Sequence, residues 1–157
     1  MNNPFKLSPE DRLTAWFDFR QSIKNKTDQE KINAVAEYWA QCPFVGWIID
    51  PEMPKEWPSV WEILFEGRYC MNTVAKCIAD TLMLVDFEES RVALAMISEN
   101  SHPDVEYMVV IIDNNHILNY SYGNSISIND VQKEISMKFM YQYKDGAYQI
   151  NNFPKQQ

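Results

Sequence analysis

The sequence predicts an α+β fold, in which an N-terminal helical hairpin and a central buried helix pack on an antiparallel sheet. Apolar residues recur at helical spacing through the first half of the chain, and short segments rich in β-branched residues follow in the second half. Helices followed by strands, without regular alternation, are typical of α+β domains. A chain of 157 residues with 46% hydrophobic residues has the size and composition of a single domain over residues 1–157.

Capping residues mark the start of the first two helices. Ser8 precedes Pro9 and two acidic residues, and Thr27 stands three positions before Glu30. Apolar residues follow at helical spacing: Leu13, Trp16, Phe17 and Ile23 in the first helix, and Ile32, Val35, Ala36, Trp39 and Ala40 in the second. A short polar turn separates the two, so residues 8–42 are predicted to form a helical hairpin.

An aromatic and proline-rich loop is predicted over residues 43–58. From Cys42 to Pro58 the chain holds four prolines and two tryptophans in seventeen residues, which favours an ordered loop held by aromatic contacts. A short helix is predicted over 58–65, which Gly67 ends in the left-handed conformation, and residues 59–150 form the remaining core. Residues 69–85 then form a helix with apolar side chains on most sides, which predicts a central, buried position.

Strands are predicted after this helix at 91–98, 105–112 and 116–120. A turn over residues 113–115 joins the second and third strands into a hairpin, and His102 lies in the loop before the second strand. Ser127 caps a short helix, and residues 137–143 and 147–150 form a final hairpin. The last residues, 151–157, are expected to fray.

Charge and cysteine content exclude several classes of function. Fourteen basic residues against 22 acidic ones give a net charge of −8, which disfavours nucleic acid as a partner, and four glycines leave few phosphate-binding loops. Three cysteines match neither a disulfide framework nor a zinc ribbon, so we expect no metal and no cofactor. Without a membrane-spanning segment or a signal region, the chain is predicted to be soluble, in a reducing compartment, with no membrane partner.

Cys70 is the strongest candidate for covalent chemistry. It stands at the predicted N-terminus of the buried helix, where free backbone N–H groups and the helix dipole favour a thiolate and could form an oxyanion hole. A free cysteine is also among the residue types most often buried as a small apolar side chain. On position alone, the packing role is favoured.

A cysteine that opens a central helix and is followed by strands resembles the transglutaminase-like members of the papain-type cysteine fold. The resemblance covers about residues 57–125. In that family a His at the start of one strand and an Asp near the end of the next activate the thiol. Glu106, in Glu106-Tyr107-Met108-Val109-Val110, stands at the His position, and Asn119, in Ile117-Leu118-Asn119-Tyr120, stands at the Asp position. The resemblance therefore implies the fold with its catalytic His and Asp missing.

The two histidines of the chain are the remaining candidates for a catalytic base. A Glu beside Cys70 would disfavour the thiolate, and Asn119 cannot stabilise an imidazolium that is absent. His102 stands four residues before Glu106 and could fold back from its loop. His116 stands three residues before Asn119, so strand alternation predicts that these two side chains point to opposite faces of the sheet.

A second resemblance covers nearly the whole chain and concerns a family of small proteins encoded by tailed bacteriophages. It rests on Trp16-Phe17-Asp18-Phe19-Arg20, Tyr38-Trp39-Ala40-Gln41-Cys42-Pro43-Phe44, Trp57-Pro58-Ser59-Val60-Trp61-Glu62-Ile63-Leu64, Ala79-Asp80-Thr81-Leu82 and Leu118-Asn119-Tyr120. These motifs carry no assigned chemistry. The resemblance implies a viral gene product located in the host cytoplasm or the virion.

Aromatic and acidic residues offer two further surfaces. The aromatic residues form either an exposed binding surface or, as we favour, contacts that hold the proline-rich loop to the helices; they are Trp39, Phe44, Trp47, Trp57 and Trp61. The acidic residues form either a patch for a basic partner or a solvated face; they are Glu52, Glu56, Glu62 and Glu66.

Together these observations favour binding over catalysis. The leading hypothesis is a phage-encoded, non-catalytic component that binds a virion or host protein, with Glu106, Asn119, Trp57 and Trp61 as binding residues. One alternative is an active cysteine acyl-transfer enzyme, of the protease or transglutaminase type, that uses Cys70 with His102 or His116. The other is an acidic inhibitor of a host defence or nucleic-acid-binding protein.

Overall fold

The computed structural model describes residues 3–44 and 49–152. The helices over these ranges are α1 (Pro9–Ile23), α2 (Asp28–Trp39), α3 (Val60–Glu66), α4 (Met71–Leu84) and α5 (Ile128–Val131), with 3₁₀ turns η1 (Pro4–Lys6), η2 (Pro54–Glu56) and η3 (Glu89–Arg91). The strands are β1 (Val92–Glu99), β2 (His102–Ile112), β3 (His116–Ser121), β4 (Asn124–Ser127), β5 (Ile135–Lys144) and β6 (Ala147–Asn152). None of these helices has the length and apolar character needed to cross a bilayer.

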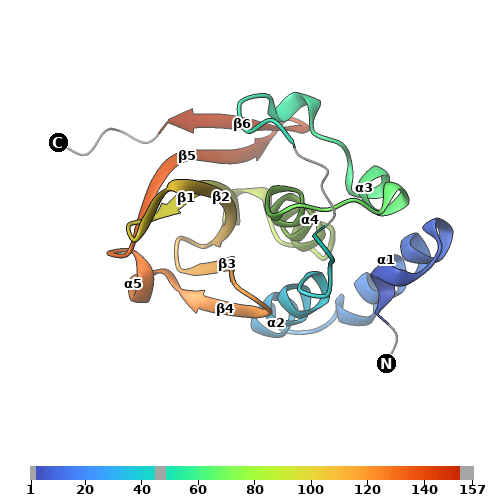
Figure 1. Cartoon of the computed structure of the whole chain (residues 1–157). Helices are drawn as coiled ribbons and strands as arrows, with labels where there is room; N and C mark the ends of the chain where they lie inside the picture. The colour runs from blue at the N-terminus through green and yellow to red at the C-terminus, as the bar shows by residue number, and fades with distance from the viewer. Residues whose placement is uncertain (1–2, 45–48, 153–157) are drawn as a thin grey trace.

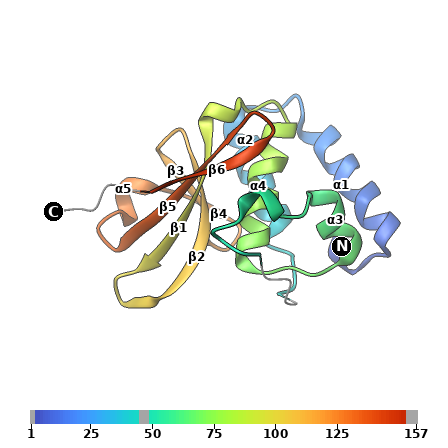
Figure 2. The same cartoon turned by 90° about the horizontal axis from the view of Figure 1, so that it is seen from above.

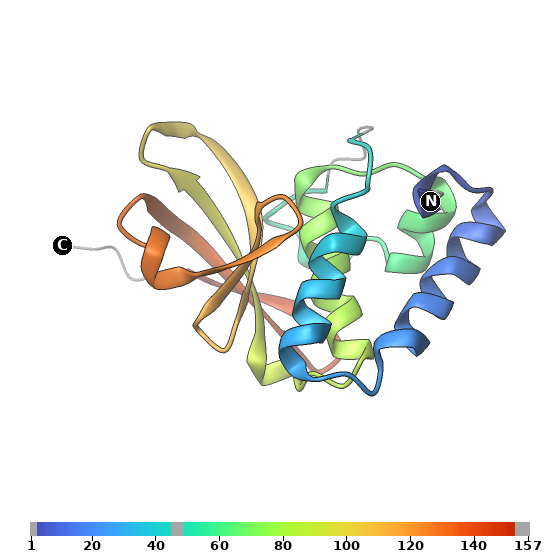
Figure 3. The ribbon, with the colours of Figure 1, turned by 90° about the horizontal axis from the view of Figure 1, so that it is seen from below.

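The predicted α+β class is confirmed. Figure 1 and Figure 3 show α1 to α4 gathered on one side of the sheet, with α5 at the far side. All strand pairs are antiparallel, in the order β4-β3-β2-β1-β5-β6. The predicted hairpins β2–β3 and β5–β6 are both present. Strand β4 was not predicted from the sequence, because its four residues are too few to show a period of two.

Helices α1 and α2 begin with side-chain caps at the positions that the sequence predicts. The hydroxyl of Ser8 accepts from the backbone N–H of Asp11 at 3.3 Å. Thr27 and Glu30 form a full capping box at the start of α2, in which each side chain accepts from the other residue's backbone N–H. The two helices contact each other through Phe19 and Tyr38, whose rings stack with centroids 4.2 Å apart. The helical hairpin is therefore present.

Two cations and a glycine complete the C-termini of α3 and α4. Gly67 ends α3 with φ +70°, and Arg12 donates to the carbonyl oxygens of Leu64 and Phe65 at 2.5 and 2.8 Å. The ammonium of Lys31, a buried side chain on α2, donates to the carbonyl oxygen that follows α4. A cation at a helix C-terminus also interacts favourably with the helix dipole.

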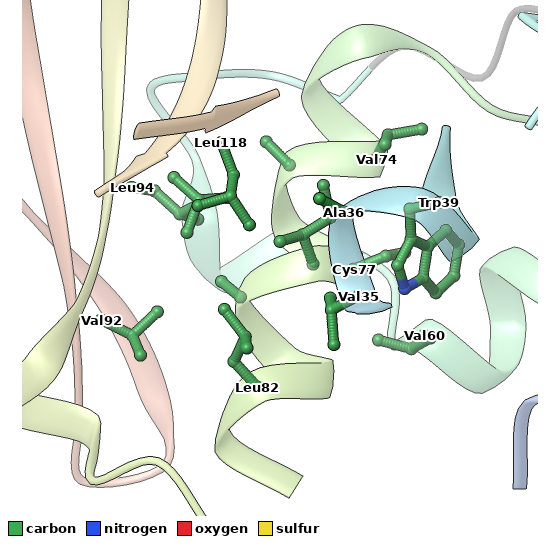
Figure 4. Close-up of a cluster of buried hydrophobic side chains, with 14 of the residues drawn as sticks. Val35, Ala36, Trp39, Val60, Val74, Cys77, Leu82, Val92, Leu94 and Leu118 are labelled. Atoms are coloured by element: carbon green, nitrogen blue, oxygen red, sulfur yellow. The ribbon is translucent and has the colours of Figure 1, made fainter. Parts of the chain in front are cut away.

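Helix α4 lies in the centre of the core, as predicted. Figure 4 shows Val74, Cys77 and Leu82 of α4 between Val35, Ala36 and Trp39 of α2 on one side and Val92, Leu94 and Leu118 of the sheet on the other. Alternate residues of the strands point away from the helices into a second cluster that contains Ala95, Ile97, Val109, Ile111, Ile117, Val131 and Ile135. Both faces of the central strands are therefore buried.

One hydroxyl joins three helices inside this core. Thr81 of α4 accepts from the indole nitrogens of Trp16 and Trp39, at 3.1 and 3.2 Å, and donates to the carbonyl oxygen of Cys77 at 2.6 Å. Both indole rings are fully buried, so each N–H needs a protein acceptor. This single contact set orients α1 and α2 on α4.

Candidate functional site at the N-terminus of helix α4

Cys70 is the N-cap residue of α4, at the helix start that the sequence predicts. Its sulfur accepts from the backbone N–H of Thr73 at 3.5 Å and lies 3.6 Å from the Thr73 hydroxyl oxygen. The same hydroxyl accepts from the Cys70 N–H at 2.7 Å, which completes a capping box. Tyr69 is buried just before it, with its ring packed edge-on against Phe5. The chain before the helix is thereby anchored, and the half-buried thiol serves as a helix cap.

Asn119 lies at the same end of α4, but its side chain hydrogen-bonds to backbone carbonyl groups and not to an imidazole. Its side-chain nitrogen donates to the carbonyl oxygens of Met71 and Met108, each at 2.9 Å. Its backbone is left-handed, with φ +66°, which asparagine tolerates better than most residues. The left-handed residue breaks the regular alternation of β3, on which the predicted opposite orientation of His116 and Asn119 depends. The Asn119 amide therefore ties β3 to β2 and to the first residue of α4.

Glu106 lies on β2 close to this helix end and has a cation as its partner. Its carboxylate accepts from the ammonium of Lys138 on β5 at 3.3 Å, and both side chains are partly exposed. Asn72, two residues after Cys70, accepts from the backbone N–H of Met108 at 2.9 Å. Glu106, Lys138 and Asn72 line one surface cavity together with Asp50 and Glu52.

The two histidines lie elsewhere on the sheet. His102 begins β2, not a loop as predicted, and its exposed ring lies 3.0 Å from the Ser101 hydroxyl and 4.0 Å from Glu99. His116 begins β3, pairs with Ile112, and lies 3.4 Å from the Ser125 hydroxyl. Ile112 is four residues along β2 from Met108, which corresponds to about 13 Å of strand, and His102 is about 20 Å away in the other direction. Strand length alone thus separates both imidazoles from the end of α4 that holds Cys70.

The two candidate tryptophans have different roles. Trp57 is buried, donates from its indole nitrogen to the carbonyl oxygen of Asp50 at 2.7 Å, and packs on Tyr141. It holds the proline-rich loop, which is the role that the sequence favours. Trp61 is half-exposed and packs edge-on against Trp16 with ring centroids 5.2 Å apart. Trp47 lies outside the described residues.

A buried polar cluster was missed by the sequence analysis. Lys76 and Asp80, one turn apart on α4, form an ion pair at 2.5 Å, and the hydroxyl of Tyr148 on β6 donates to the other carboxylate oxygen. The signal in the sequence is a Lys and an Asp at i and i+4 in a helix that is otherwise apolar on most sides. Over residues 3–44 and 49–152, no group of three or more His, Cys, Asp or Glu side chains is arranged to hold a metal ion.

Comparisons with known proteins place the fold. No family model and no curated protein matches the chain. Solved structures of Legionella pneumophila LapG are similar: one superimposes with a TM-score of 0.71 at 16% identity, covering 89% of this chain and 78% of LapG. Calcium-bound and EGTA-treated LapG each give a TM-score of 0.72 at 15% identity, covering 91% and 92% of this chain and 80% and 82% of LapG. The fold is therefore transglutaminase-like, and the likeness extends well beyond residues 57–125.

Proposed function

We propose that this chain is a non-catalytic component that binds a protein partner on a transglutaminase-like scaffold. The observation that carries the proposal is the double hydrogen bond of Asn119 to the carbonyl oxygens of Met71 and Met108. Asn119 stands at the position where this fold would orient a catalytic base, but its side chain links β3 to β2 and to α4. The proposed phage origin, and a partner in the virion or the host, rest on the resemblance of five sequence motifs to a family of bacteriophage proteins.

The surroundings of Cys70 support the same proposal. A cysteine nucleophile acts as the thiolate, and a neighbouring base or cation normally supplies that form near neutral pH. The Cys70 sulfur makes its polar contacts with Thr73, while Glu106, at the position of the base, accepts a hydrogen bond from Lys138. Nothing in these contacts takes up the proton of the thiol, so the group is suited to capping the helix and not to acyl transfer.

Alkylation kinetics test whether Cys70 is activated. The folded protein would be treated with iodoacetamide between pH 6 and 9, and the modified cysteine would be identified by mass spectrometry. We expect Cys70 to react within about tenfold of the rate of glutathione at pH 7, since an ordinary thiol is only a few per cent thiolate at that pH, and full ionisation would raise the rate by no more than about thirtyfold. Cys42 and Cys77 are buried, which raises the pKa of both thiols, so they should stay unmodified in the folded protein.

Cys70→Ser serves as the control because it keeps a side-chain acceptor at the helix cap. In this variant the alkylation of the folded protein should disappear while the circular dichroism spectrum is unchanged. Alkylation of Cys70 more than about tenfold faster than that of glutathione at pH 7, with a rate that no longer rises between pH 7 and 9, would indicate a stabilised thiolate and overturn the proposal. Hydrolysis or cross-linking of casein by the native protein that is lost in Cys70→Ser would also overturn it.

A further inference from the structure

A groove distinct from the α4 N-terminus opens between α3, residues 76–84 of α4, η2 and the β5–β6 hairpin. Figure 2 shows the turn of that hairpin lying beside α4. Aromatic and aliphatic side chains form its walls, among them Trp57, Trp61, Leu84 and Tyr143. Trp61 and Leu84 are 49% and 40% exposed, so a bound molecule could cover apolar surface that now faces water.

Buried charge lies in this apolar groove. Lys76 is 7% exposed and Tyr148 is 4% exposed, and both contact the Asp80 carboxylate. Burial and the neighbouring Asp80 carboxylate raise the pKa of the Tyr148 phenol well above its usual range, so the phenol stays protonated and keeps its hydrogen bond. An apolar groove with a few convergent polar groups is the usual form of a binding site.

The hydrogen-bonding capacity of Lys76 indicates what the ligand offers. An ammonium carries three N–H donors. Among the residues that the structure describes, Asp80 is its hydrogen-bond acceptor, and the Tyr148 ring lies 5.9 Å away. The ammonium therefore has donors available to a hydrogen-bond acceptor on a ligand that enters the groove.

The charge of the groove indicates that this acceptor is neutral. Lys55 and Lys76 balance Glu62 and Asp80 among the lining residues, so the groove has no net charge. A ligand carboxylate on Lys76 would meet the Asp80 carboxylate on the same ammonium, and like charges at such separations repel. An amide carbonyl oxygen accepts the same hydrogen bond without this repulsion.

We propose that the groove binds an apolar peptide segment of the protein partner, with a backbone carbonyl oxygen on the Lys76 ammonium and a large apolar side chain between Trp61 and Leu84. The proposal rests on the protein-binding function proposed above. Trp61 supplies the kind of half-exposed, large aromatic surface that dominates protein interfaces. Backbone carbonyls supply the neutral acceptor that the groove requires.

Three small probes test the chemistry of the ligand. N-acetyl-phenylalaninamide is neutral and carries amide carbonyls, N-acetyl-phenylalanine carries a carboxylate, and phenylalaninamide carries an ammonium. Each would be titrated into ¹⁵N-labelled protein and followed by two-dimensional NMR. We expect shifts at the Trp61 indole and at the backbone amides of Gly146 and Ala147, with the neutral probe binding at least about threefold more tightly than either charged one. Because N-acetyl-phenylalanine keeps an amide carbonyl and adds a carboxylate, its equal or tighter binding would overturn the preference for an uncharged ligand.

A matched pair of variants tests the location. Trp61 and Phe65 lie one turn apart on α3 and are 49% and 48% exposed, but the groove contains Trp61 and not Phe65. Trp61→Ala should weaken binding of the neutral probe at least about fivefold, and Phe65→Ala should leave it unchanged. Lys76→Met is not used, because it would leave the Asp80 carboxylate without its cation and could prevent folding. Leu84→Ser changes an exposed side chain of the groove wall instead and serves as the second variant.

The outcomes separate this proposal from the one on which it rests. The groove proposal would be overturned if the probes caused no chemical-shift changes at the groove residues, or if Trp61→Ala and Phe65→Ala weakened probe binding equally. Either outcome would leave the alkylation result for Cys70 unaffected. Concentration-dependent shifts at the same residues without a probe would identify a second copy of the chain as the occupant, and would also overturn it. Rapid alkylation of Cys70 would instead overturn the non-catalytic function while probe binding persisted.

Discussion

The side-chain amide of Asn119 donates a hydrogen bond to the carbonyl oxygen of Met71 at the start of α4. The two residues lie 48 positions apart, and the contact joins the third strand to the first turn of the central helix. Because the same nitrogen also donates to Met108, the amide uses both of its N–H donors on backbone acceptors. The position therefore requires a donor, which a carboxylate does not provide.

We expect Asn119→Asp to lower the free energy of unfolding by about 2 to 4 kcal/mol at pH 7, since two carbonyl oxygens lose their donor and face a charge. The deficit should narrow at low pH, where the new carboxyl becomes protonated and can donate one hydrogen bond. Urea denaturation at pH 7 and pH 4 measures both effects. Asn124→Asp is the control: its amide also donates to the chain, but from an exposed site. Equal losses in the two variants would contradict the role of Asn119.

Thr81→Val should lower the free energy of unfolding by about 2 to 4 kcal/mol, because the buried indole nitrogens of Trp16 and Trp39 both lose their acceptor. The shape of the side chain is nearly unchanged, so the loss reports the hydroxyl. Thermal unfolding followed by circular dichroism provides the measurement. Thr81→Ser keeps the hydroxyl and should retain most of the stability, and a similar drop in both variants would point to packing instead.

Alanine substitutions at two glycines with similar backbone angles distinguish the cost of backbone strain from the cost of a steric clash. Gly67 and Gly146 have φ +70° and +84°, but a Cβ on Gly67 would lie 3.0 Å from the Arg12 guanidinium, whereas one on Gly146 has no neighbour within 4 Å among the described residues. Left-handed backbone costs an alanine about 1 kcal/mol at either site. Gly67→Ala should cost about 1 kcal/mol more, because Arg12 must shift from the carbonyl oxygens that end α3. Denaturant titration of both variants gives the difference directly, and equal losses would exclude an effect through Arg12.

An ion pair at the ends of the central strands β1 and β2 predicts part of the dependence of stability on acid pH. Arg91 donates twice to the Asp113 carboxylate, at 2.7 and 2.8 Å, and this contact lowers the pKa of Asp113. A lowered pKa stabilises the folded chain above the pKa of the unfolded state, and this stabilisation is lost as pH falls through the folded value. Asp113→Asn should therefore be destabilising at pH 7, with a difference from the native chain that shrinks below about pH 4.

Stability measured against pH from 7 to 2 tests this sign. Asp104→Asn, on an exposed part of β2, is the control and should leave the curve unchanged. A difference between Asp113→Asn and the native chain that grows toward low pH would contradict the prediction.

Most of the fold could be predicted because its signals are local. Ser8 and Thr27 cap the helices at the predicted positions, since the bonds of a cap join residues three apart in the sequence. The buried helix was evident from its apolar composition, and Cys70 at its start followed from that boundary. Strand β2 begins at His102 and not at Val105 as predicted, because pairing with β1 across a bulge near Glu99 extends it past Pro103.

The site could be predicted in its position but not in its contacts. Cys70 and Asn119 do lie at one end of α4, yet the amide of Asn119 turns toward the helix because its left-handed backbone interrupts the alternation of β3. No local sequence pattern predicts a left-handed asparagine within a strand, since asparagine is also common in regular turns. The Lys76 cluster was missed for a related reason: its third member, Tyr148, lies 68 residues from Asp80.

The shared acceptor of Trp16 and Trp39 has a consequence for how the first two helices separate from α4. An indole proton exchanges with solvent only when its hydrogen bond opens, and these two protons end on the single oxygen of Thr81. Detachment of α1 alone would free the first proton and leave the second protected, whereas joint detachment of α1 and α2 from α4 would free both at one rate. The pair of indole signals thus reports whether the first two helices open as one unit or in succession.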